Sequence, residues 1–332
     1  MAVDKDVTVV IDIQRPTPKT GLGRPLIIGA AASATEFKVY NDLQEVLADF
    51  PSQTEIYKAA YAMFGQGEDA PETIAVMQYT TGGLSDFLSK VFTKDWYYLV
   101  STARTVDDIT MIGDAVEIDD SRLFVVATPS KDDLSTIFAK KYERTVAFYH
   151  TNIANYPDAA VIGKVGSADA GSLTWKFKTL AGIEPLDLTQ EELEEIHDLG
   201  AITYVTKAGD DVTSEGKTVS GEYIDIIQSK DYLIMSIENA VQKLFNRSPK
   251  VRYDNTGIAQ IEGEVKTVLR QADLNGMIAH DDDDLPIYST TFKPRSQVDP
   301  LDREKRIYNG GAFEFELSGA IHKSKISGVI KL

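Results

Sequence analysis

The sequence contains no cysteine and no long apolar run. Without thiols the chain cannot form disulfides, cysteine-ligated zinc sites or a cysteine nucleophile, so packing alone must hold the fold. No apolar segment approaches the roughly 20 residues of a membrane-spanning helix. The first ten residues lack the basic start and apolar centre of a signal peptide. We therefore expect a soluble protein that does not use the general secretion pathway and does not insert into membranes.

Basic residues are scarce. Lys and Arg number 34 against 51 Asp and Glu, which gives a net charge of −17 and an isoelectric point near 4.7. Such a surface repels phosphate backbones, which argues against nucleic acid as a partner. Residues 285–332 contain 8 basic and 5 acidic residues, so the excess of acid lies in the rest of the chain. This asymmetry suits contact between copies, and ordinary scatter of surface charge explains it equally well.

Motifs for catalysis and cofactor binding are also missing. Gly21 and Gly23 precede the first compact strand and lack the third glycine of a dinucleotide loop. The sequence has no Walker loop or nucleophile elbow, and its four histidines have no metal-ligand spacing. The acidic run at 281–284 could attract a hard cation, but a solvated loop is the better interpretation. We expect no catalytic residue, no cofactor and no metal site.

Residues 25–150 alternate between short apolar runs and amphipathic segments, and 43% hydrophobic residues supply a real core. Strands that are apolar throughout, separated by helices, predict an α/β domain with a mostly parallel sheet covered on both faces. The predicted strands are 26–30, 73–79, 96–101, 123–128 and 145–149. The predicted helices are 42–50, 54–64, 84–92, 106–116 and 131–142.

The pattern is less regular beyond this part. Strands are predicted at 173–178 and 202–206, and Thr189 followed by Glu192 matches the capping box of an acidic helix. We place a domain boundary near Gly221, where a loop rich in Gly, Asp, Ser and Thr ends.

The C-terminal region predicts a smaller α+β domain. Apolar stripes predict helices at 232–247 and 257–273. Two strand-like runs on either side of the turn residues 309–311 predict a hairpin. One more alternating strand is predicted from Lys325 to the last residue.

Both ends of the chain have the sequence of strands. Apolar residues alternate with polar ones at the N-terminus, and an arm of residues 4–20 could span about 50 Å at ~3.3 Å per residue. It could therefore reach a second subunit. A free strand pairs with an exposed sheet edge, which the hairpin around Asn309 would offer. From the residues alone, pairing within the same chain is an equally good interpretation.

Four segments form a recognisable ordered set: Gly-Ser-Leu-Thr-Trp-Lys-Phe-Lys-Thr-Leu-Ala-Gly-Ile at 171–183, Glu-Tyr-Ile-Asp-Ile-Ile at 222–227, Lys-Asp-Tyr-Leu at 230–233 and Tyr-Asp-Asn-Thr-Gly-Ile-Ala-Gln-Ile-Glu at 253–262. Taken in order, they resemble the tail sheath proteins of contractile phage tails and related contractile injection particles. The resemblance covers mainly residues 160–280. The departure from the family lies at residues 251–254, Val-Arg-Tyr-Asp, where an Ile-Pro-Tyr-Thr type of entry to the late helix is expected.

The resemblance implies a structural subunit, not an enzyme. Such subunits stack as hexameric rings into a helical sheath around an inner tail tube, and contraction drives the tube through the host envelope. The implied partners are further copies of the chain, the tube protein, and baseplate and tail terminator proteins. The implied location is the virion tail, assembled in the host cytoplasm. Residues 1–20 would be an N-terminal arm, 21–220 the α/β sheath domain, 221–322 the α+β domain, and 323–332 the C-terminal arm.

The resemblance also assigns roles to individual residues. The strand arms that join neighbouring subunits would carry Val7, Val9, Ile11, Ile13, Ile326, Val329, Ile330 and Leu332. The acceptor hairpin would contain Ile307, Tyr308, Phe313, Phe315 and Leu317. The hinges at the arm roots would be Gly21, Gly23 and Gly319. The helix that faces the tube would present Glu262, Glu264, Lys266 and Arg270.

Two alternatives of other classes stay open from the sequence. The alternation of strands and helices also suits an α/β enzyme, which would need a cleft with convergent polar groups. Another tail component, such as a tube or baseplate protein, would also self-assemble without catalytic motifs. The α/β part disfavours a tube, since a tube protein would be nearly all β.

Overall fold

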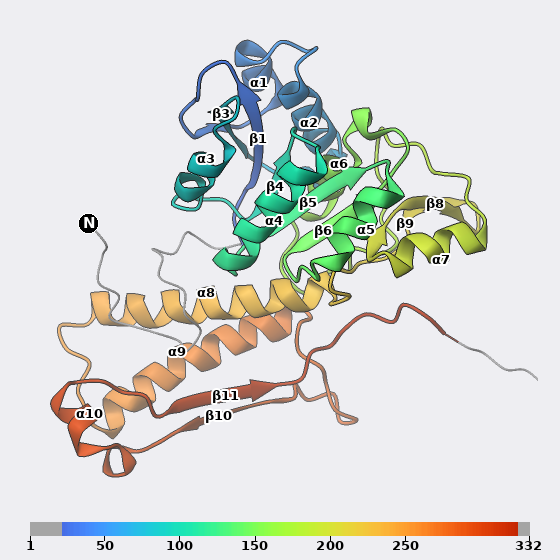
Figure 1. Ribbon diagram of the computed structural model, residues 1–332. Coiled ribbons are helices and arrows are strands. Elements are labelled where there is room, and N and C mark those ends of the chain that lie inside the picture. The colour runs from blue at the N-terminus through green and yellow to red at the C-terminus, as the bar shows by residue number, and fades with distance from the viewer. Residues whose placement is uncertain (1–21, 325–332) are drawn as a thin grey trace, which may run out of the picture.

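The computed structural model describes residues 22–324 (Figure 1). Its first part is built on the strands β1 (Pro25–Ala31), β2 (Lys38–Tyr40), β3 (Ile74–Thr80), β4 (Tyr98–Ser101), β5 (Leu123–Thr128), β6 (Thr145–Tyr149) and β7 (Ala201–Ile202). They form one sheet in the order β2-β3-β1-β4-β5-β6-β7, and only β2 runs antiparallel to its neighbour. Every residue of β5 is buried, as a strand covered on both faces requires. The predicted mostly parallel sheet is confirmed.

Helices cover both faces of this sheet. One face packs against α1, α2 and α6, and the other against α3, α4, α5 and α7. Side chains of Ser, Thr and Asp cap the starts of five of these helices by accepting a backbone N–H of the first turn. The predicted capping box of Thr189 and Glu192 is present. The helices are α1 (Leu43–Asp49), α2 (Glu55–Phe64), α3 (Leu84–Val91), α4 (Val106–Asp119), α5 (Lys131–Ala139), α6 (Pro157–Val165) and α7 (Gln190–Asp198).

The strand predicted at 173–178 is wrong. This segment is a loop in which Trp175 is fully buried and Phe177 has a φ of 63°. Thr213 at the end of β9 (Asp210–Thr213) holds the loop: its hydroxyl donates to the Trp175 carbonyl at 2.6 Å, and its carbonyl accepts the Phe177 N–H at 3.0 Å. A positive φ cannot continue an extended strand. The strand predicted at 202–206 is divided between β7 and β8 (Tyr204–Lys207), which pairs with β9.

Two long helices lead into the C-terminal part. α8 (Ile224–Arg247) and α9 (Asn255–Leu274) lie side by side below the α/β part (Figure 1). The helix predicted at 232–247 therefore starts earlier than expected. The reason is tertiary: Ile224 and Ile227 are buried in the α/β core, whereas Leu233 and Ile237 belong to the core shared with α9. One continuous helix thus connects the two cores.

The hairpin predicted around Asn309 is wrong. β11 (Gly311–Phe315) pairs antiparallel with β10 (Tyr288–Phe292), which lies on the far side of the helix α10 (Pro300–Glu304). Asp299 caps α10, and Arg306, at a φ of 60°, ends it in a Schellman turn in which the Ile307 N–H donates to the Asp302 carbonyl at 2.9 Å. After this turn the chain passes the end of β10. The segment that precedes β11 therefore does not pair with β11 as the second strand of a hairpin.

The residues predicted for the acceptor hairpin therefore do not lie together in one hairpin. Phe313 and Phe315 lie in β11, and Leu317 forms an isolated bridge with Ile278. Ile307 and Tyr308 lie outside the strand pair. The Tyr308 ring stacks on Phe292 with the ring centroids 6.2 Å apart, and its hydroxyl donates to the Lys293 carbonyl at 2.9 Å.

Candidate functional site

The two-stranded sheet of β10 and β11 has one apolar and one polar face. Tyr288, Phe292, Phe313 and Phe315 pack against the core of α8 and α9. The alternate residues Ser289, Thr291, Ala312 and Glu314 are exposed. This alternation fixes which face is covered. The polar face and the two long edges of the sheet remain.

Each of those long edges is a strand edge. The Lys293 N–H donates to the Gly310 carbonyl at 3.0 Å, and the Glu316 N–H donates to the Ile287 carbonyl at 3.0 Å. Because hydrogen-bonded and non-bonded pairs alternate in an antiparallel ladder, this register directs the backbone groups of Ser289 and Thr291 toward β11. The N–H and C=O groups of Thr290 and Phe292 point outward from β10, and those of Gly311, Phe313 and Phe315 point outward from β11. Within residues 22–324 this sheet has no third strand, so both edges can accept one.

The helix α8 is joined to the α/β part by a buried ion pair. Asp231 of α8 receives a hydrogen bond from Arg144 Nη2 at 3.0 Å and one from the Tyr97 hydroxyl at 2.6 Å. The side chains of Arg144 and Asp231 are only 3% and 6% exposed. Burial alone would lower the pKa of Arg144, but the facing Asp231 carboxylate raises it, so the guanidinium stays charged. A buried pair of this kind fixes the position of α8 on the sheet.

A second buried contact reinforces this junction. Gln228, one turn before Asp231, donates to the Tyr98 hydroxyl at 2.6 Å and accepts the indole N–H of Trp175 at 3.0 Å. The sequence pattern did not indicate this network, although two of its members, Trp175 and Asp231, lie in the segments that carry the family resemblance. Asp231 and Gln228 lie before the helix predicted at 232–247, so no predicted apolar stripe contained them.

The glycines predicted as hinges differ in their surroundings. Gly21 lies outside the described residues. Gly23 has a φ of 110°, and a Cβ there would lie 3.2 Å from the Cβ of Tyr97, so a close approach of two segments requires glycine. Gly319 has a φ of 55°, and a Cβ there would have open space around it. The surroundings of Gly319 thus leave room for rotation, and its role as a hinge stays a prediction.

The charged residues named for the tube-facing helix lie on α9, and most have partners within the chain. Glu262 pairs with Lys266 at 2.7 Å and accepts the Thr290 hydroxyl at 2.9 Å, and Glu264 pairs with Arg247 of α8. Arg270 is exposed. The exposed face of α9 consists mainly of uncharged residues: Thr256, Ala259, Gln260, Gly263, Thr267, Gln271 and Leu274. Contact with a tube stays a prediction.

The arm residues Val7, Val9, Ile11, Ile13, Ile326, Val329, Ile330 and Leu332 lie outside the described part of the chain.

The acidic run at 281–284 is a structured turn. The Asp281 carboxylate accepts the backbone N–H groups of Asp283 and Leu285 at 3.0 and 2.9 Å. The His280 ring lies between Asp284 at 2.9 Å and Asp273 at 2.7 Å. Among residues 22–324, no group of three or more His, Cys, Asp or Glu side chains is placed to hold a metal ion.

His280 should titrate above the ordinary histidine range. Its hydrogen bonds to Asp284 and Asp273 raise its pKa, so the bonds are at full strength at pH below the unfolded value of about 6.5 and are lost as the pH rises through the raised value. An NMR titration of the His280 ring should show this raised pKa. Asp273→Asn should lower it, and Asp282→Asn, in the same turn, is the control. A ring that titrates at the ordinary value in the unmodified chain would contradict the expectation.

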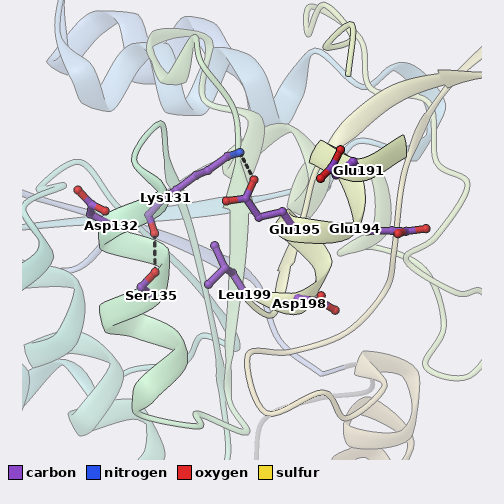
Figure 2. Close-up of a pocket in the computed structure, with 8 residues that line it drawn as sticks. All are labelled: Lys131, Asp132, Ser135, Glu191, Glu194, Glu195, Asp198 and Leu199. Carbon is purple, nitrogen blue, oxygen red and sulfur yellow. Dashed lines mark hydrogen bonds and ion pairs between the residues drawn. The ribbon is translucent and has the colours of Figure 1, made fainter. Parts of the chain in front are cut away.

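A shallow groove between α5 and α7 is lined mostly by acids (Figure 2). Lys131 pairs with Glu195 at 2.5 Å, and the Ser135 hydroxyl donates to the Lys131 backbone carbonyl at 3.0 Å. These groups do not form a nucleophile with an adjacent base. The acids Asp132, Glu191, Glu194, Glu195 and Asp198 surround the single lysine.

No helix within residues 22–324 combines the length and the apolar character that spanning a bilayer demands. Solved structures with a similar fold come from particles with contractile sheaths. A chain from the helical sheath of the anti-feeding prophage, in its contracted state, matches with a TM-score of 0.64 at 13% identity, over 99% of both chains. This chain has the sheath fold.

Two further solved structures share the sheath fold over most of the chain. A chain from the baseplate of the anti-feeding prophage, in its contracted state, has a TM-score of 0.70 at 13% identity and covers 100% of this chain and 99% of its own. The sheath tail protein Lin1278 from Listeria innocua has a TM-score of 0.56 at 11% identity and covers 91% and 96%. No family model matches the sequence. No curated protein matches it either.

Proposed function

We propose that this chain is a structural subunit of a contractile sheath. It would polymerise as stacked hexameric rings around an inner tube and contract to drive the tube through a host envelope. The observation that carries the proposal is the whole-length likeness to a chain of a contracted helical sheath, with 99% of both chains covered. A likeness of that extent involves the C-terminal part as well as the common α/β layer, which many enzymes also possess.

The strand edges of β10 and β11 give the proposal its mechanism. The arms at 1–20 and 323–332 would each add a strand to one of these edges in a neighbouring copy, and Thr290 and Phe313 present outward backbone groups for that purpose. Backbone ladders depend little on side chains, so the connections can persist while subunits change their relative angle. The sheath would thus remain joined as it contracts.

The buried junction at Asp231 gives each subunit a rigid body. Contraction transmits force only if the α/β part and the part that holds the strand edges move together. Side-chain hydrogen bonds of Arg144 and Gln228 hold α8 against the sheet. Movement would therefore be confined to the arms and to the surfaces between copies.

The partners follow from the same proposal. They are further copies of the chain, an inner tube protein, and baseplate and tail terminator proteins, in a particle tail that is assembled in the host cytoplasm. The face of α9 around Gly263, Thr267 and Arg270 is exposed, and this is the surface we assign to the tube. The likeness to a baseplate chain at a TM-score of 0.70 favours a second candidate, a ring of the same fold at the baseplate end.

Electron microscopy of the purified chain tests the proposal. We expect cylinders with a regular repeat from the full chain, and dispersed particles from a variant that lacks residues 2–20. A single ring that does not stack would favour the baseplate candidate. A full-length chain that stays monomeric at high concentration, alone and with its tail partners, would contradict both.

A further inference from the structure

The C-terminal segment returns to the α/β part after β11. The Ser318 N–H donates to the Met277 carbonyl at 2.8 Å, within the C-terminal part. Ala320 and Ile321 are then exposed, Ile321 at 88%, whereas His322 is half-buried. His322 is the only residue of the described stretch 318–324 that is not exposed. A single side chain therefore attaches this segment to the α/β part.

The His322 ring occupies a slot with an aromatic wall on each of two sides. Its Nε2 lies 2.9 Å from the Thr174 hydroxyl. The Tyr223 ring meets it edge-on with the centroids 5.2 Å apart, and the Phe177 ring does so at 6.2 Å. Edge-on contacts at these separations are favourable for aromatic rings. The slot thus holds one imidazole by two ring contacts and by a hydrogen bond at one of its two nitrogens.

The slot is part of the fixed body. Phe177, with its φ of 63°, is a bulky residue in the left-handed region, and the residue remains 44% exposed. Its N–H donates to the Thr213 carbonyl, and the Thr213 hydroxyl donates to the carbonyl of nearby Trp175. Tyr223 directly precedes α8. Strained backbone that presents an aromatic ring at a surface is typical of a contact site.

Charge around the slot disfavours a protonated ring. Lys217 lies over the Tyr223 ring at 4.7 Å, and Lys176 and Lys207 lie over the Phe177 ring at 5.2 and 5.9 Å. Glu215, paired with Lys176 at 2.6 Å, and Asp225 of α8 are the acids that face the site. The Nδ1 atom of His322 is buried without a hydrogen-bond partner, so a proton there would be unsatisfied. Burial, together with Lys176, lowers the pKa of His322.

We propose that His322 is a releasable latch: docked in its slot it shortens the C-terminal arm, and on leaving the slot during contraction it adds residues 319–322 to the arm. The inference rests on the proposed sheath function, since the arm must join two copies. Four freed residues extend the reach by about 13 Å at ~3.3 Å per residue. Gly319, with open space around it, is where the freed segment would turn. The released residues would thus lengthen the connection between neighbouring subunits when these subunits separate.

Docking can be tested by NMR on the variant that lacks residues 2–20, which is expected to stay dispersed. With four histidines in the chain, the His322 ring is assigned by comparison with His322→Gln. Its pKa should lie below about 6.5 and return toward that value in Phe177→Ala, with Ile321→Ala as the matched control on the same segment. The neutral ring docks, so docking should weaken as the pH falls below about 6.5. A pKa that Phe177→Ala does not change would overturn the latch.

Release can be tested on assembled particles. Because the chain has no cysteine, the double variant Thr174→Cys, His322→Cys carries the only two thiols, and a short bismaleimide can join them. Cylinders should assemble with and without the cross-link, and only the cross-linked ones should fail to contract. The single variants, treated with the same reagent, are the controls. Cross-linked cylinders that contract normally would refute the latch alone, whereas an unmodified chain that forms no cylinders would refute the proposed function and the latch with it.

Discussion

Thr290→Pro is expected to abolish cylinder formation while the monomer stays folded. Proline removes the N–H that Thr290 directs outward from β10, and it leaves the ladder bonds of Ser289 and Thr291 to β11 in place. The arm of a neighbouring copy would then have an unpaired carbonyl and would meet the proline ring. An unsatisfied buried group costs about 1–3 kcal/mol, roughly 5- to 150-fold in affinity at each contact. Sedimentation of polymer against protein concentration measures the effect.

Two variants at the same place separate assembly from folding. Thr290→Val keeps the N–H and loses only the hydroxyl bond to Glu262, so it should polymerise. Thr291→Pro removes a ladder bond to Ala312 and should instead destabilise the monomer, which thermal unfolding would detect. If Thr290→Pro forms cylinders at the concentration of the unmodified chain, the β10 edge does not accept an arm.

Asp231→Ala is expected to be the most destabilising single change at the junction between the two cores. It leaves the Arg144 guanidinium buried without its counter-charge and removes the acceptor of the Tyr97 hydroxyl. Breaking a buried pair in this way costs about 3–5 kcal/mol in the free energy of unfolding. Denaturant unfolding followed by circular dichroism measures it.

Two further variants show where the loss of stability in Asp231→Ala arises. Lys230→Ala, next to Asp231 on α8 and exposed, should change the free energy of unfolding by less than about 0.5 kcal/mol. The double variant Arg144→Met, Asp231→Leu removes both charges at once and should recover a large part of the loss. A variant Asp231→Ala as stable as the unmodified chain would show that the pair does not hold α8 to the sheet.

Local patterns were sufficient for the α/β part. The apolar run at 123–128 became β5 with the same bounds, because a strand buried on both faces has to be apolar throughout. The predicted starts of the helices were close because Thr54, Thr105 and Ser130 are capping residues whose action is confined to one turn. Interactions within a few residues decide both features.

The errors occurred where distant segments decide the structure. The turn residues 309–311 suggest a hairpin. No residue nearby in the sequence indicates that β11 pairs instead with β10, which lies before α10. Trp-Lys-Phe at 175–177 has strand propensity, and Thr213 overrides it from 36 residues away by fixing the Phe177 backbone. The start of α8 was placed too late because Asp231 and Gln228 look polar in isolation, and only their partners on the sheet make them buried.

The sequence by itself determined the layered α/β body, the absence of thiol chemistry, the acidic surface and, through its resemblance to sheath proteins, the expected fold. The tertiary structure decided which strand pairs with β11, how α8 is fixed to the sheet, and where the C-terminal segment attaches. Local signals survive in a sequence because each depends on a few neighbouring residues. Edges, buried ion pairs and slots depend on groups that approach one another only after the chain has folded.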